Sequence, residues 1–595
     1  MLASSSPSKQ YLYLDRITPA IKSRLHSIVG ASYDRSKRRW FIPFDSYSDL
    51  KRYVPTMQLD AQTESAIIRY EKKKQHILSI KELKDIDLPE IKGLKAELYP
   101  YQKVGVAFLD QLEDNQGAIL GFDMGLGKSL TSLATFMLWK QKGIVDYCLV
   151  VCPAPLKYAT WAKEIEKWTD LSYIVIDGKK REEVKWDDGT VEKLSGKKLR
   201  QVQYQQYLFG TDVLIMNYEL FLHDRDILPK FDRRWCVILD EAHRIKNAKG
   251  LNNPKAKPTI TKVVHETLKN QVGRKILGTG TPLQNDLSEL WSLVDFCRPH
   301  LLGSPSRFNQ QYMILDEYFR PIAPKYQMLD DFKQRIAPII LRKTKEDALP
   351  NLPELVVQDY WVELTPKQKK LYKEVAEGIL YNLKSEEFKY LDVLPQLIHL
   401  QQVCDSPALL RELTGDDSLP VQSGKLKVLK EIIEDLNPAV NKFILFSQFR
   451  SMTDILYNWL VEQKLLKKSQ IGYVNGDTDS FKIGEIQDGF QNGDIQCVVM
   501  TTAGNYGLNL SAGSYVICYD QLFNPQVMQQ IYSRCHRNGA KNAVTAINLL
   551  TKNTYEERKL QILTEKKALF KDVIDYEGDS AYLQQLTVEE LLALI

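Results

Sequence analysis

Short runs of apolar residues alternate with longer amphipathic stretches along most of the chain from residue 98 onward. In the first half, six such runs have the length of buried strands: 117–121, 147–152, 172–176, 213–216, 236–239 and 274–277. Continuous apolar runs are typical of strands buried on both faces. Strands that alternate with helices predict an α/β unit with a parallel sheet covered by helices. The charged segment 179–206 interrupts the alternation, and we expect a surface insertion there.

The second half of the chain repeats this pattern after an interruption. Residues 300–420 lose the strand signal, and their pattern predicts a mostly helical region. Apolar runs return at 442–447, 471–474, 497–501, 515–519 and 544–550. The simplest interpretation is a second α/β lobe, similar to the first and separated from it by helices.

Residues 11–55 form a small predicted module ahead of the two lobes. Helical spacing covers 17–28, a hairpin with a charged turn is expected over 31–44, and a short helix over 47–53. The Lys-rich stretch 57–93 predicts a connecting helix. Residues 1–55 carry ten Lys or Arg against four Asp or Glu, so their charge of 10 − 4 = +6 exceeds the +5 of the whole chain. A basic face can bind an anionic polymer, although a solvated surface is the more common reason for such charge.

The overall composition limits the classes of protein to consider. Of 595 residues, 44 % are hydrophobic and 26 % charged, which is ordinary for a soluble globular protein of several domains. The apolar runs are too short to span a bilayer, and the Ser-rich N-terminus lacks the apolar core of a secretory signal. The eight Cys form no CxxC pair or Cys/His metal spacing, so we expect an intracellular, reducing compartment and no structural zinc.

A glycine-rich loop follows the first predicted strand and opens a helix. It comprises Asp123, Met124, Gly125, Leu126, Gly127, Lys128 and Ser129. The glycines let backbone N–H groups face phosphate oxygens, Lys128 can reach the β- and γ-phosphates, and the Ser129 hydroxyl can ligate magnesium. Phe122 stands where the strict eight-residue pattern has its first Gly, so a turn that serves only packing stays an alternative.

Two further elements point to the same chemistry. Asp240 and Glu241 end a buried strand, where the first can hold magnesium and the second can orient and deprotonate water. Arg534 and Arg537 lie three residues apart near a predicted helix start, and arginines placed across a cleft can neutralise a transferring phosphoryl group. Taken singly, a solvated acidic strand end and surface arginines explain these residues as well.

Taken together, these motifs resemble the Swi/Snf family of superfamily-two DNA-dependent ATPases. Twelve short stretches match that family in order: 98–102, 123–129, 151–156, 217–219, 240–243, 278–285, 341–345, 423–425, 446–449, 501–504, 507–510 and 530–539. The resemblance implies an α/β fold of two RecA-like parallel-sheet lobes, ATP and Mg²⁺ as ligands, and double-stranded DNA as partner. Phe122, Asn505 and Ala540 depart from the family pattern without removing a catalytic group.

The family pattern also implies roles for single residues. Gln102 resembles the adenine-reading glutamine, and residues 123–129 resemble the phosphate and magnesium loop. Asp240 and Glu241 resemble the metal-binding and water-activating pair, and Arg534 and Arg537 resemble the arginine fingers of the second lobe. Thr279 and Thr281 resemble the motif that couples the ATP and DNA sites. The residues that match DNA-tracking segments of the family are Pro153, Leu156, Asn217, Tyr218, Ser447, Gln448, Thr501 and Thr502.

The N-terminal module is similar to the HARP domain of the annealing-helicase subfamily. The similarity rests on 33–34, the basic turn 35–39, Trp40 and 47–50. It implies that Arg38, Arg39 and Trp40 contact DNA, and an aromatic ring beside basic residues can stack on an unpaired base. The alternative is that Trp40 and Phe44 form the core of the module.

We therefore expect an intracellular, DNA-associated, monomeric ATPase that moves along double-stranded DNA and remodels or reanneals branched DNA. Its predicted parts are a HARP-like module (1–56), a helical linker (57–95), lobe 1 with the ATP site (96–300), a helical protrusion and inter-lobe region (301–420), lobe 2 (421–570) and a helical tail (571–595). Two alternatives stay open. One is a helicase that separates DNA or RNA strands, and the other is an ATP-gated clamp that binds DNA junctions without remodelling them.

Overall fold

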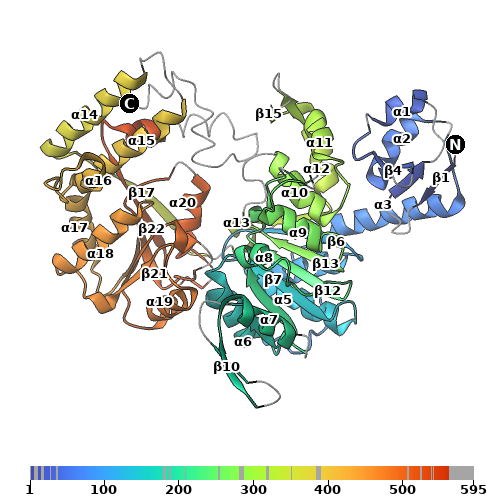
Figure 1. Cartoon of the computed structure of the whole chain (residues 1–595), viewed down its shortest axis with the longest axis horizontal. Coiled ribbons are helices and arrows are strands. Elements are labelled where there is room, and N and C mark those ends of the chain that lie inside the picture. Colours follow the sequence, from blue (N-terminus) through green and yellow to red (C-terminus); the bar gives the residue numbers. More distant parts are fainter. Residues whose placement is uncertain are drawn as a thin grey trace. The chain divides into compact units, whose positions relative to one another are not determined.

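The structure is a computed structural model, and Figure 1 shows its elements. It describes residues 2–5, 11–14, 19–26, 28–34, 38–55, 57–177, 182–185, 189–207, 210–248, 250–251, 253, 255–280, 287–315, 321–349, 352–383, 390–505, 508–522, 525–537, 539–540 and 542–561. The chain forms two compact units. The first comprises Met1–Asp123, Gly127–Lys157 and Trp161–Thr344, and the second comprises Met124–Leu126, Tyr158–Thr160 and Lys345–Ile595.

The first unit contains a seven-stranded sheet whose strands are all parallel, and we call this sheet with its helices lobe 1. The strand order is β16-β6-β13-β12-β7-β11-β8. The strands are β6 (Gln116–Phe122), β7 (Tyr147–Cys152), β8 (Tyr173–Val175), β11 (Val213–Asn217), β12 (Trp235–Asp240), β13 (Arg274–Gly278) and β16 (Ile340–Lys343). Six of them lie on the six predicted apolar runs. The parallel sheet expected for the first half is therefore confirmed.

The second unit contains a six-stranded parallel sheet, which with its helices we call lobe 2. The strand order is β17-β22-β21-β18-β20-β19. The strands are β17 (Leu355–Val362), β18 (Lys442–Phe446), β19 (Ile471–Val474), β20 (Cys497–Met500), β21 (Gly513–Cys518) and β22 (Val544–Thr551). Two parallel-sheet lobes with helices confirm the α/β fold class of two RecA-like lobes.

The region 300–420 differs from the prediction of a mostly helical segment. It does contain helices, among them α12 (Leu329–Ile336), α14 (Pro366–Leu383) and α15 (Tyr390–Asp405). It also supplies β16 and β17, each of which forms one of the two edges of its sheet. Most residues of β17 are exposed, so this strand lacks the continuous apolar run that marks a buried strand.

A five-stranded sheet in the order β3-β4-β2-β1-β5 forms the N-terminal module. Its strands are β1 (Leu2–Ser5), β2 (Tyr11–Leu14), β3 (Ser32–Asp34), β4 (Arg39–Pro43) and β5 (Gln58–Leu59). Antiparallel pairing of β3 with β4 confirms the predicted hairpin. Helices α1 (Pro19–Leu25) and α2 (Tyr47–Tyr53) match the two predicted short helices, and α3 (Ala61–Lys81) matches the connecting helix.

Buried polar contacts join the N-terminal module to lobe 1. Arg335 of α12 is 5 % exposed and donates to Ser46 Oγ at 2.8 Å, and its Nη2 lies 3.2 Å from Asp49 Oδ2. The Tyr11 hydroxyl donates to the backbone carbonyl of Pro299. A side chain on Gly30 would have its Cβ 2.5 Å from the Leu301 carbonyl oxygen, so the two backbones are in close contact. The module is therefore packed on lobe 1.

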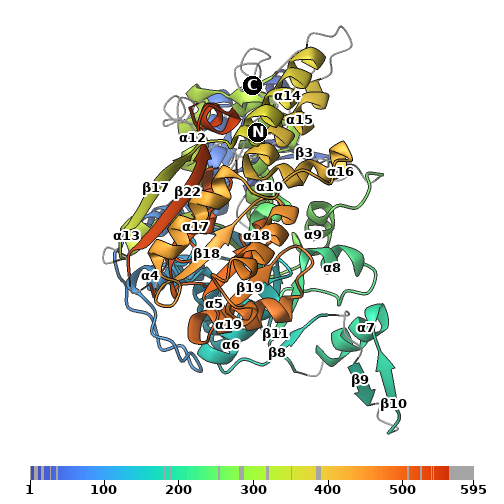
Figure 2. The same ribbon diagram turned by 90° about the vertical axis from the view of Figure 1, so that its left-hand side faces the viewer.

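The described residues of the charged segment, 182–185 and 189–206, form a small substructure apart from the main sheet (Figure 2). Strands β9 (Glu182–Lys185) and β10 (Val191–Leu194) pair only with each other among the described strands, and α7 (Gly196–Tyr207) follows them. This agrees with the expected surface insertion. All eight Cys are buried free thiols. Among the described helices, none is long and apolar enough to cross a membrane. The predicted tail 571–595 and Thr281 lie outside the described residues.

Candidate active site

The loop after β6 has a backbone that suits an anion. Gly125 and Gly127 adopt left-handed conformations with φ of 87° and 72°, which are strained for residues with a Cβ. Helix α5 (Lys128–Gln141) begins directly after Gly127, so its first N–H groups and the positive end of its dipole face the loop. A Cβ on Gly127 would lie 2.3 Å from Nε2 of Gln102. The structure therefore brings the predicted adenine-reading side chain against the predicted phosphate loop.

Lys128 and Asp123 fix the two ends of this loop. The Lys128 ammonium donates to the backbone carbonyl of Phe122 at 2.8 Å. The Asp123 carboxylate forms an ion pair with Arg342 Nη2 at 2.8 Å. The other guanidinium nitrogen of Arg342 donates to the Gly280 carbonyl at 2.7 Å, so this β16 side chain joins the loop to the segment after β13. Ser129 is the second residue of α5 and therefore also belongs to the loop edge.

Asp240 ends β12 at the same edge of the sheet and is held by several donors. Its Oδ2 accepts from the indole nitrogen of Trp161 at 2.9 Å, and its Oδ1 accepts from the Glu241 backbone N–H at 3.0 Å. The Tyr218 hydroxyl donates to the Asp240 backbone carbonyl at 2.8 Å. Burial, and then the neighbouring Glu241 carboxylate, raise the pKa of Asp240 to about 6, whereas Lys128 and the Trp161 bond lower it. Each carboxylate oxygen keeps a second lone pair for a further ligand.

Glu241 has a strained backbone, with φ 48° and ψ 54° in the left-handed region. Such conformations in residues other than glycine are uncommon and are concentrated at functional sites. The side chain is buried, and its Oε2 lies 3.4 Å from His243 Nδ1. The conformation turns the chain sharply after Asp240, so both carboxylates stay at the end of β12.

Lys128 and Asp240 meet over Gly278, the last residue of β13. A Cβ on Gly278 would lie 3.5 Å from Asp240 Oδ1 and 3.8 Å from Lys128 Cδ. The absence of that side chain leaves room for an ammonium and a carboxylate beside the glycine loop. Magnesium prefers oxygen ligands and is commonly bound by one or two carboxylates together with phosphate. The Asp240 carboxylate and Ser129 hydroxyl fit such a metal by their chemistry. The next residue, Thr279, is buried, and its backbone N–H donates to the Leu120 carbonyl.

Most lobe 1 side chains predicted to track DNA are committed inside the protein. Leu156 and Tyr218 are 2 % and 0 % exposed, and Pro153 is buried. The Tyr218 hydroxyl donates to the Asp240 backbone carbonyl, and the Asn217 side-chain amide donates to the Glu219 carboxylate at 2.7 Å. Direct side-chain contact of Leu156 and Tyr218 with DNA is therefore not supported. The Tyr218 bond to Asp240 instead places the start of α8 (Tyr218–His223) next to the candidate ATP site.

The two predicted arginine fingers follow a helix end instead of a helix start. Helix α20 (Pro525–Tyr532) ends before both of them. Arg534 is 2 % exposed, and its Nε donates to the Gln530 carbonyl at 3.0 Å. Nη1 atoms of Arg534 and Arg537 donate to the same carbonyl, that of Leu508, at 3.4 and 3.2 Å. Lobe 2 therefore positions the two guanidinium groups together, in a turn.

Ser447 and Gln448 are held by Asp520 at the carboxyl edge of the lobe 2 sheet. Asp520 Oδ1 accepts from the Gln448 backbone N–H at 2.8 Å, and Oδ2 accepts from the Ser447 hydroxyl. Ser447 is 0 % exposed, so its hydroxyl is not available to a phosphate in this conformation. In contrast, Nε2 of Gln448 is buried and has no hydrogen-bond partner among the described residues. Thr501 is buried, whereas Thr502 is exposed and begins the short helix η7 (Thr502–Asn505).

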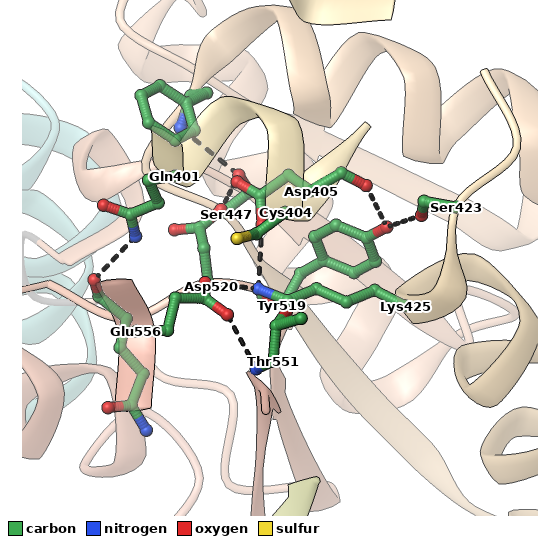
Figure 3. A network of polar contacts seen from close by, with 12 residues as sticks. Gln401, Cys404, Asp405, Ser423, Lys425, Ser447, Tyr519, Asp520, Thr551 and Glu556 are labelled. Carbon is green, nitrogen blue, oxygen red and sulfur yellow. Dashed lines mark hydrogen bonds and ion pairs between the residues drawn. The ribbon is translucent and has the colours of Figure 1, made fainter. Parts of the chain in front are cut away.

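A buried ionic network lies next to Asp520, and Figure 3 shows its members. The Lys425 ammonium donates to Asp405 Oδ1 at 2.9 Å, to Glu556 Oε1 at 2.6 Å and to the Tyr519 carbonyl at 2.9 Å. The Lys425, Asp405 and Glu556 side chains are 0–3 % exposed. The two carboxylates raise the pKa of Lys425 despite the opposing effect of its burial. One ammonium thus joins the end of α15, the start of α17 (Gly424–Leu436) and the segment after β22.

The N-terminal module uses Trp40 as a core residue. Trp40 and Phe44 are each 1 % exposed and pack with Leu12, Ile42 and Leu50. The predicted base-stacking role of Trp40 is therefore not supported, because the hairpin directs the ring inward. The Arg39 guanidinium carbon lies 3.9 Å from the centre of the Tyr13 ring. Arg39 therefore makes a cation–π contact within the module. Arg38 is exposed.

Three functional positions escaped the sequence reasoning. Trp161 and Arg342 hold Asp240 and Asp123, and Asp520 holds Ser447 and Gln448. Asp520 follows a buried strand as Asp240 does, so the same strand-end signal applies to it. No local pattern marks Trp161, whose partner is distant in sequence. Arg342 lies in the matched stretch 341–345, but its contact with the distant Asp123 could not be predicted from that match.

Two family profiles match the chain. The profile of the SNF2-related domain matches residues 101–409, and the profile of the helicase conserved C-terminal domain matches residues 424–539. The first match alone covers more than half of the chain.

Relatives and solved structures show the same similarity. A Bacillus subtilis protein provisionally named ATP-dependent helicase/translocase YwqA is 29 % identical over 530 residues, which are 85 % of this chain and 52 % of that protein. The ISWI chromatin-remodeling complex ATPase ISW1 of Saccharomyces cerevisiae is 29 % identical over 82 % of this chain and 41 % of its own length. The chain thus spans about half the length of these curated relatives. The Sulfolobus solfataricus SWI2/SNF2 ATPase core in complex with dsDNA is 29 % identical, covers 86 % of this chain and 99 % of that chain, and has a TM-score of 0.36.

Proposed function

The chain belongs to the SNF2-related family, and from this premise we propose that it is an ATP-hydrolysing motor that translocates on double-stranded DNA. One observation carries the ATPase part of the proposal. Lys128, Asp240 and the loop that contains Gly127 lie together at one edge of the lobe 1 sheet, with the Gln102 amide against the loop. Ligands of open α/β sheets bind at this carboxyl edge.

The proposed roles follow from the chemistry of the side chains. Gly125, Gly127 and the start of α5 offer N–H groups to the phosphates, and Lys128 exchanges its loop carbonyl for a phosphate oxygen. Ser129 and Asp240 would hold Mg²⁺, which when bound neutralises charge on the β- and γ-phosphates. Gln102, already against the loop, would read the adenine ring.

Glu241 is proposed to act on the attacking water. Its carboxylate orients the water and accepts a proton as the water oxygen bonds to the γ-phosphorus and the bond to the β,γ-bridging oxygen breaks. Burial of Glu241 restricts bulk water around the base. Arg534 and Arg537 are proposed to contribute positive charge from lobe 2 to the same transferring phosphoryl group, and in GTPases an arginine finger contributes about 10³–10⁵-fold to kcat.

The proposed DNA contact in lobe 2 centres on Gln448. Its Nε2 is a buried donor without an acceptor among the described residues. Because Gln448 as a whole is only half-buried, rotation of its side chain would present this donor to a phosphate oxygen. Asp520 fixes the Gln448 backbone, so the amide is presented from a rigid support. A backbone contact of this kind does not read bases, which suits a motor that moves along any sequence.

Preference for branched or fork-like DNA is the finer part of the proposal. The HARP-like module has exposed basic residues in α1, in α2 and directly before β4: Lys22, Arg24, Lys51, Arg52 and Arg38. With Trp40 in the core, these exposed charges and not base stacking support DNA binding by the module. We propose that the chain acts as a monomer.

Strand displacement and strand annealing assays separate the proposed translocase from a strand-separating helicase. With ATP, a translocase that reanneals forks converts a partly unwound duplex to full duplex and displaces little of a paired strand. Efficient displacement of a fully paired strand would favour the helicase instead. An ATP-gated clamp would bind the same junctions without producing either product.

A further inference from the structure

A charged cleft lies in the first unit, at the amino edge of the lobe 1 sheet, opposite the carboxyl edge that holds the candidate ATP site. It has a volume of about 290 Å³ and lies between α3 and the amino edge of the sheet. Gln116, the first residue of β6, lines it, whereas the glycine loop follows Phe122 at the far end of that strand. At about 3.3 Å per residue, the two ends of β6 are roughly 20 Å apart. The cleft is therefore separate from the candidate ATP site.

Positive charge dominates this cleft. Arg69, Lys73 and Lys74 line it from α3, together with the apolar Ala66 and Ile77 of the same helix. Arg298, which directly follows α10 (Leu287–Cys297), also lines it. Two carboxylates offset part of this charge. Glu113 lies 2.6 Å from Lys73 Nζ, and Asp45 of the N-terminal module lies 2.7 Å from Lys74 Nζ. Four cations against two carboxylates leave 4 − 2 = +2.

Arg69 and Arg298 form no ion pair among the described residues, and Arg298 is the one of the two with a buried donor. Its Nε is buried and has no hydrogen-bond acceptor among the described residues. Buried donors are nearly always paired, so an orphan donor in a charged cleft indicates a missing acceptor. The positive charge of Arg298 also acts on Lys73, whose pKa is lowered by burial first and then by Arg298 and Arg274. A folded protein gains free energy when an anion relieves such repulsion.

We propose that this cleft binds the phosphate group of an anionic ligand, with Arg298 as the principal contact and Lys73 as the second. A guanidinium matches phosphate geometry, the Arg298 Nε lacks an acceptor among the described residues, and the Lys73 ammonium adds charge from α3. The phosphate can belong to a small polyphosphate in solution or to the backbone of bound DNA. The proposal goes beyond the motor activity, since it needs no hydrolysis and involves none of the ATP-site residues.

The test measures phosphate binding in full-length protein that carries Lys128→Ala, so that the glycine loop does not contribute. Sodium pyrophosphate is titrated by calorimetry, and a labelled 20-base-pair duplex is titrated by fluorescence anisotropy. Adding Arg298→Gln should weaken at least one of the two affinities by about tenfold, the loss of one charge-assisted hydrogen bond. Adding Arg225→Gln, a change in an exposed arginine elsewhere in lobe 1, should leave both unchanged.

The pattern of losses identifies the source of the phosphate. A loss confined to pyrophosphate indicates a small ligand, and a loss confined to the duplex indicates the DNA backbone. Lys73 lines the same cleft from α3, so Lys73→Gln should reproduce the loss. This second variant keeps the test valid if Arg298→Gln lowers the melting temperature. Unchanged affinity for both probes in both variants would overturn the proposal, whether or not the protein proves to be an ATPase.

Discussion

The indole nitrogen of Trp161 donates a hydrogen bond to the Asp240 carboxylate over 2.9 Å, although 79 residues separate them. Trp161 belongs to a short π-helical turn (Lys157–Ala162), a conformation that is frequent at functional sites. This turn directly follows the segment that includes Pro153 and Leu156. One side chain thus connects a segment with a family resemblance to DNA-tracking motifs to the proposed magnesium ligand.

Loss of this bond should shift the pH dependence of hydrolysis. Trp161→Phe keeps the ring but removes a donor that stabilises the charged Asp240 carboxylate. The pKa of that group, already raised to about 6 by burial and Glu241, should rise further. Activity needs the ionised carboxylate, so the acid limb of kcat should move to higher pH while the rate at pH 8 changes least. Trp168→Phe, in a partly exposed tryptophan nearby, serves as control, and superimposable profiles for Trp161→Phe and wild type would contradict the role.

The Lys425 network should be essential for the stability of lobe 2. Lys425→Met leaves Asp405 and Glu556 as buried carboxylates without their shared cation, which should lower the free energy of unfolding by about 3–5 kcal/mol. The pKa of Asp405 is already raised by burial. Removing the ammonium raises the pKa of Asp405 further, so the variant should regain stability as pH falls and this carboxylate takes up a proton.

Urea denaturation at pH 5.5 and 8 measures both effects. Lys430→Met is the matched control, because Lys430 lies on the same helix α17 in an exposed pair with Glu434 at 4.0 Å. An exposed pair of this kind contributes at most about 1 kcal/mol. Equal losses for the two variants would show that the buried network is not a special support of the lobe.

Asp520→Asn should weaken DNA binding without affecting basal hydrolysis. The substitution keeps the shape but removes a charged acceptor that fixes the Ser447 hydroxyl and the Gln448 N–H. The DNA concentration for half-maximal ATPase should rise by about tenfold, the value of one hydrogen bond to a charged group. Asp494→Asn, in an exposed carboxylate of lobe 2, should leave it unchanged. A wild-type DNA dependence for Asp520→Asn would refute the positioning role.

The N-terminal module is best tested in the full chain and not by deletion. Removing residues 1–56 would take Ser46 and Asp49 from the buried Arg335 guanidinium, so a truncated chain should lose stability as well as DNA contacts. The triple variant Arg38→Glu, Lys51→Glu and Arg52→Glu changes exposed residues only.

This triple variant should bind forked DNA less tightly and with a shallower salt dependence. Each lost phosphate contact lowers the slope of log K against log salt by about 0.9. The triple variant Lys367→Glu, Lys369→Glu and Lys370→Glu makes the same charge change on exposed residues of α14 and should retain the fork preference. An unchanged ratio of fork to duplex affinity in the module variant would refute the HARP-like role.

The sequence allowed most of the central strands to be predicted, because strands buried on both faces of a parallel sheet need continuous apolar residues. It also indicated the glycine loop and the Asp240–Glu241 strand end, whose residue types are required locally by their chemistry. Strands β16 and β17 were missed, since only one residue of each is buried and neither needs an apolar run, whereas the edge strands β8 and β19 lie on predicted runs.

Contacts between distant segments could not be predicted from local patterns. Arg335 reaches Ser46 across 289 residues, and Asp520 reaches Ser447 across 73. Trp40 shows the converse error, because an aromatic residue beside a basic run fits a nucleic-acid surface and a core equally well by sequence. Only the three-dimensional packing, which leaves it 1 % exposed, distinguishes the two.

The most direct test of the central claim is steady-state ATP hydrolysis by the full chain, measured without DNA and with single-stranded, duplex and forked DNA. Wild-type protein should be stimulated more strongly by duplex and forked DNA than by single strands. Lys128→Ala should be inactive, and Glu241→Gln should bind ATP with wild-type affinity yet not hydrolyse it, because it loses the base and keeps the shape. A rate that no DNA raises, or near-normal turnover in Glu241→Gln, would contradict a DNA-stimulated motor with its active site at the end of β12.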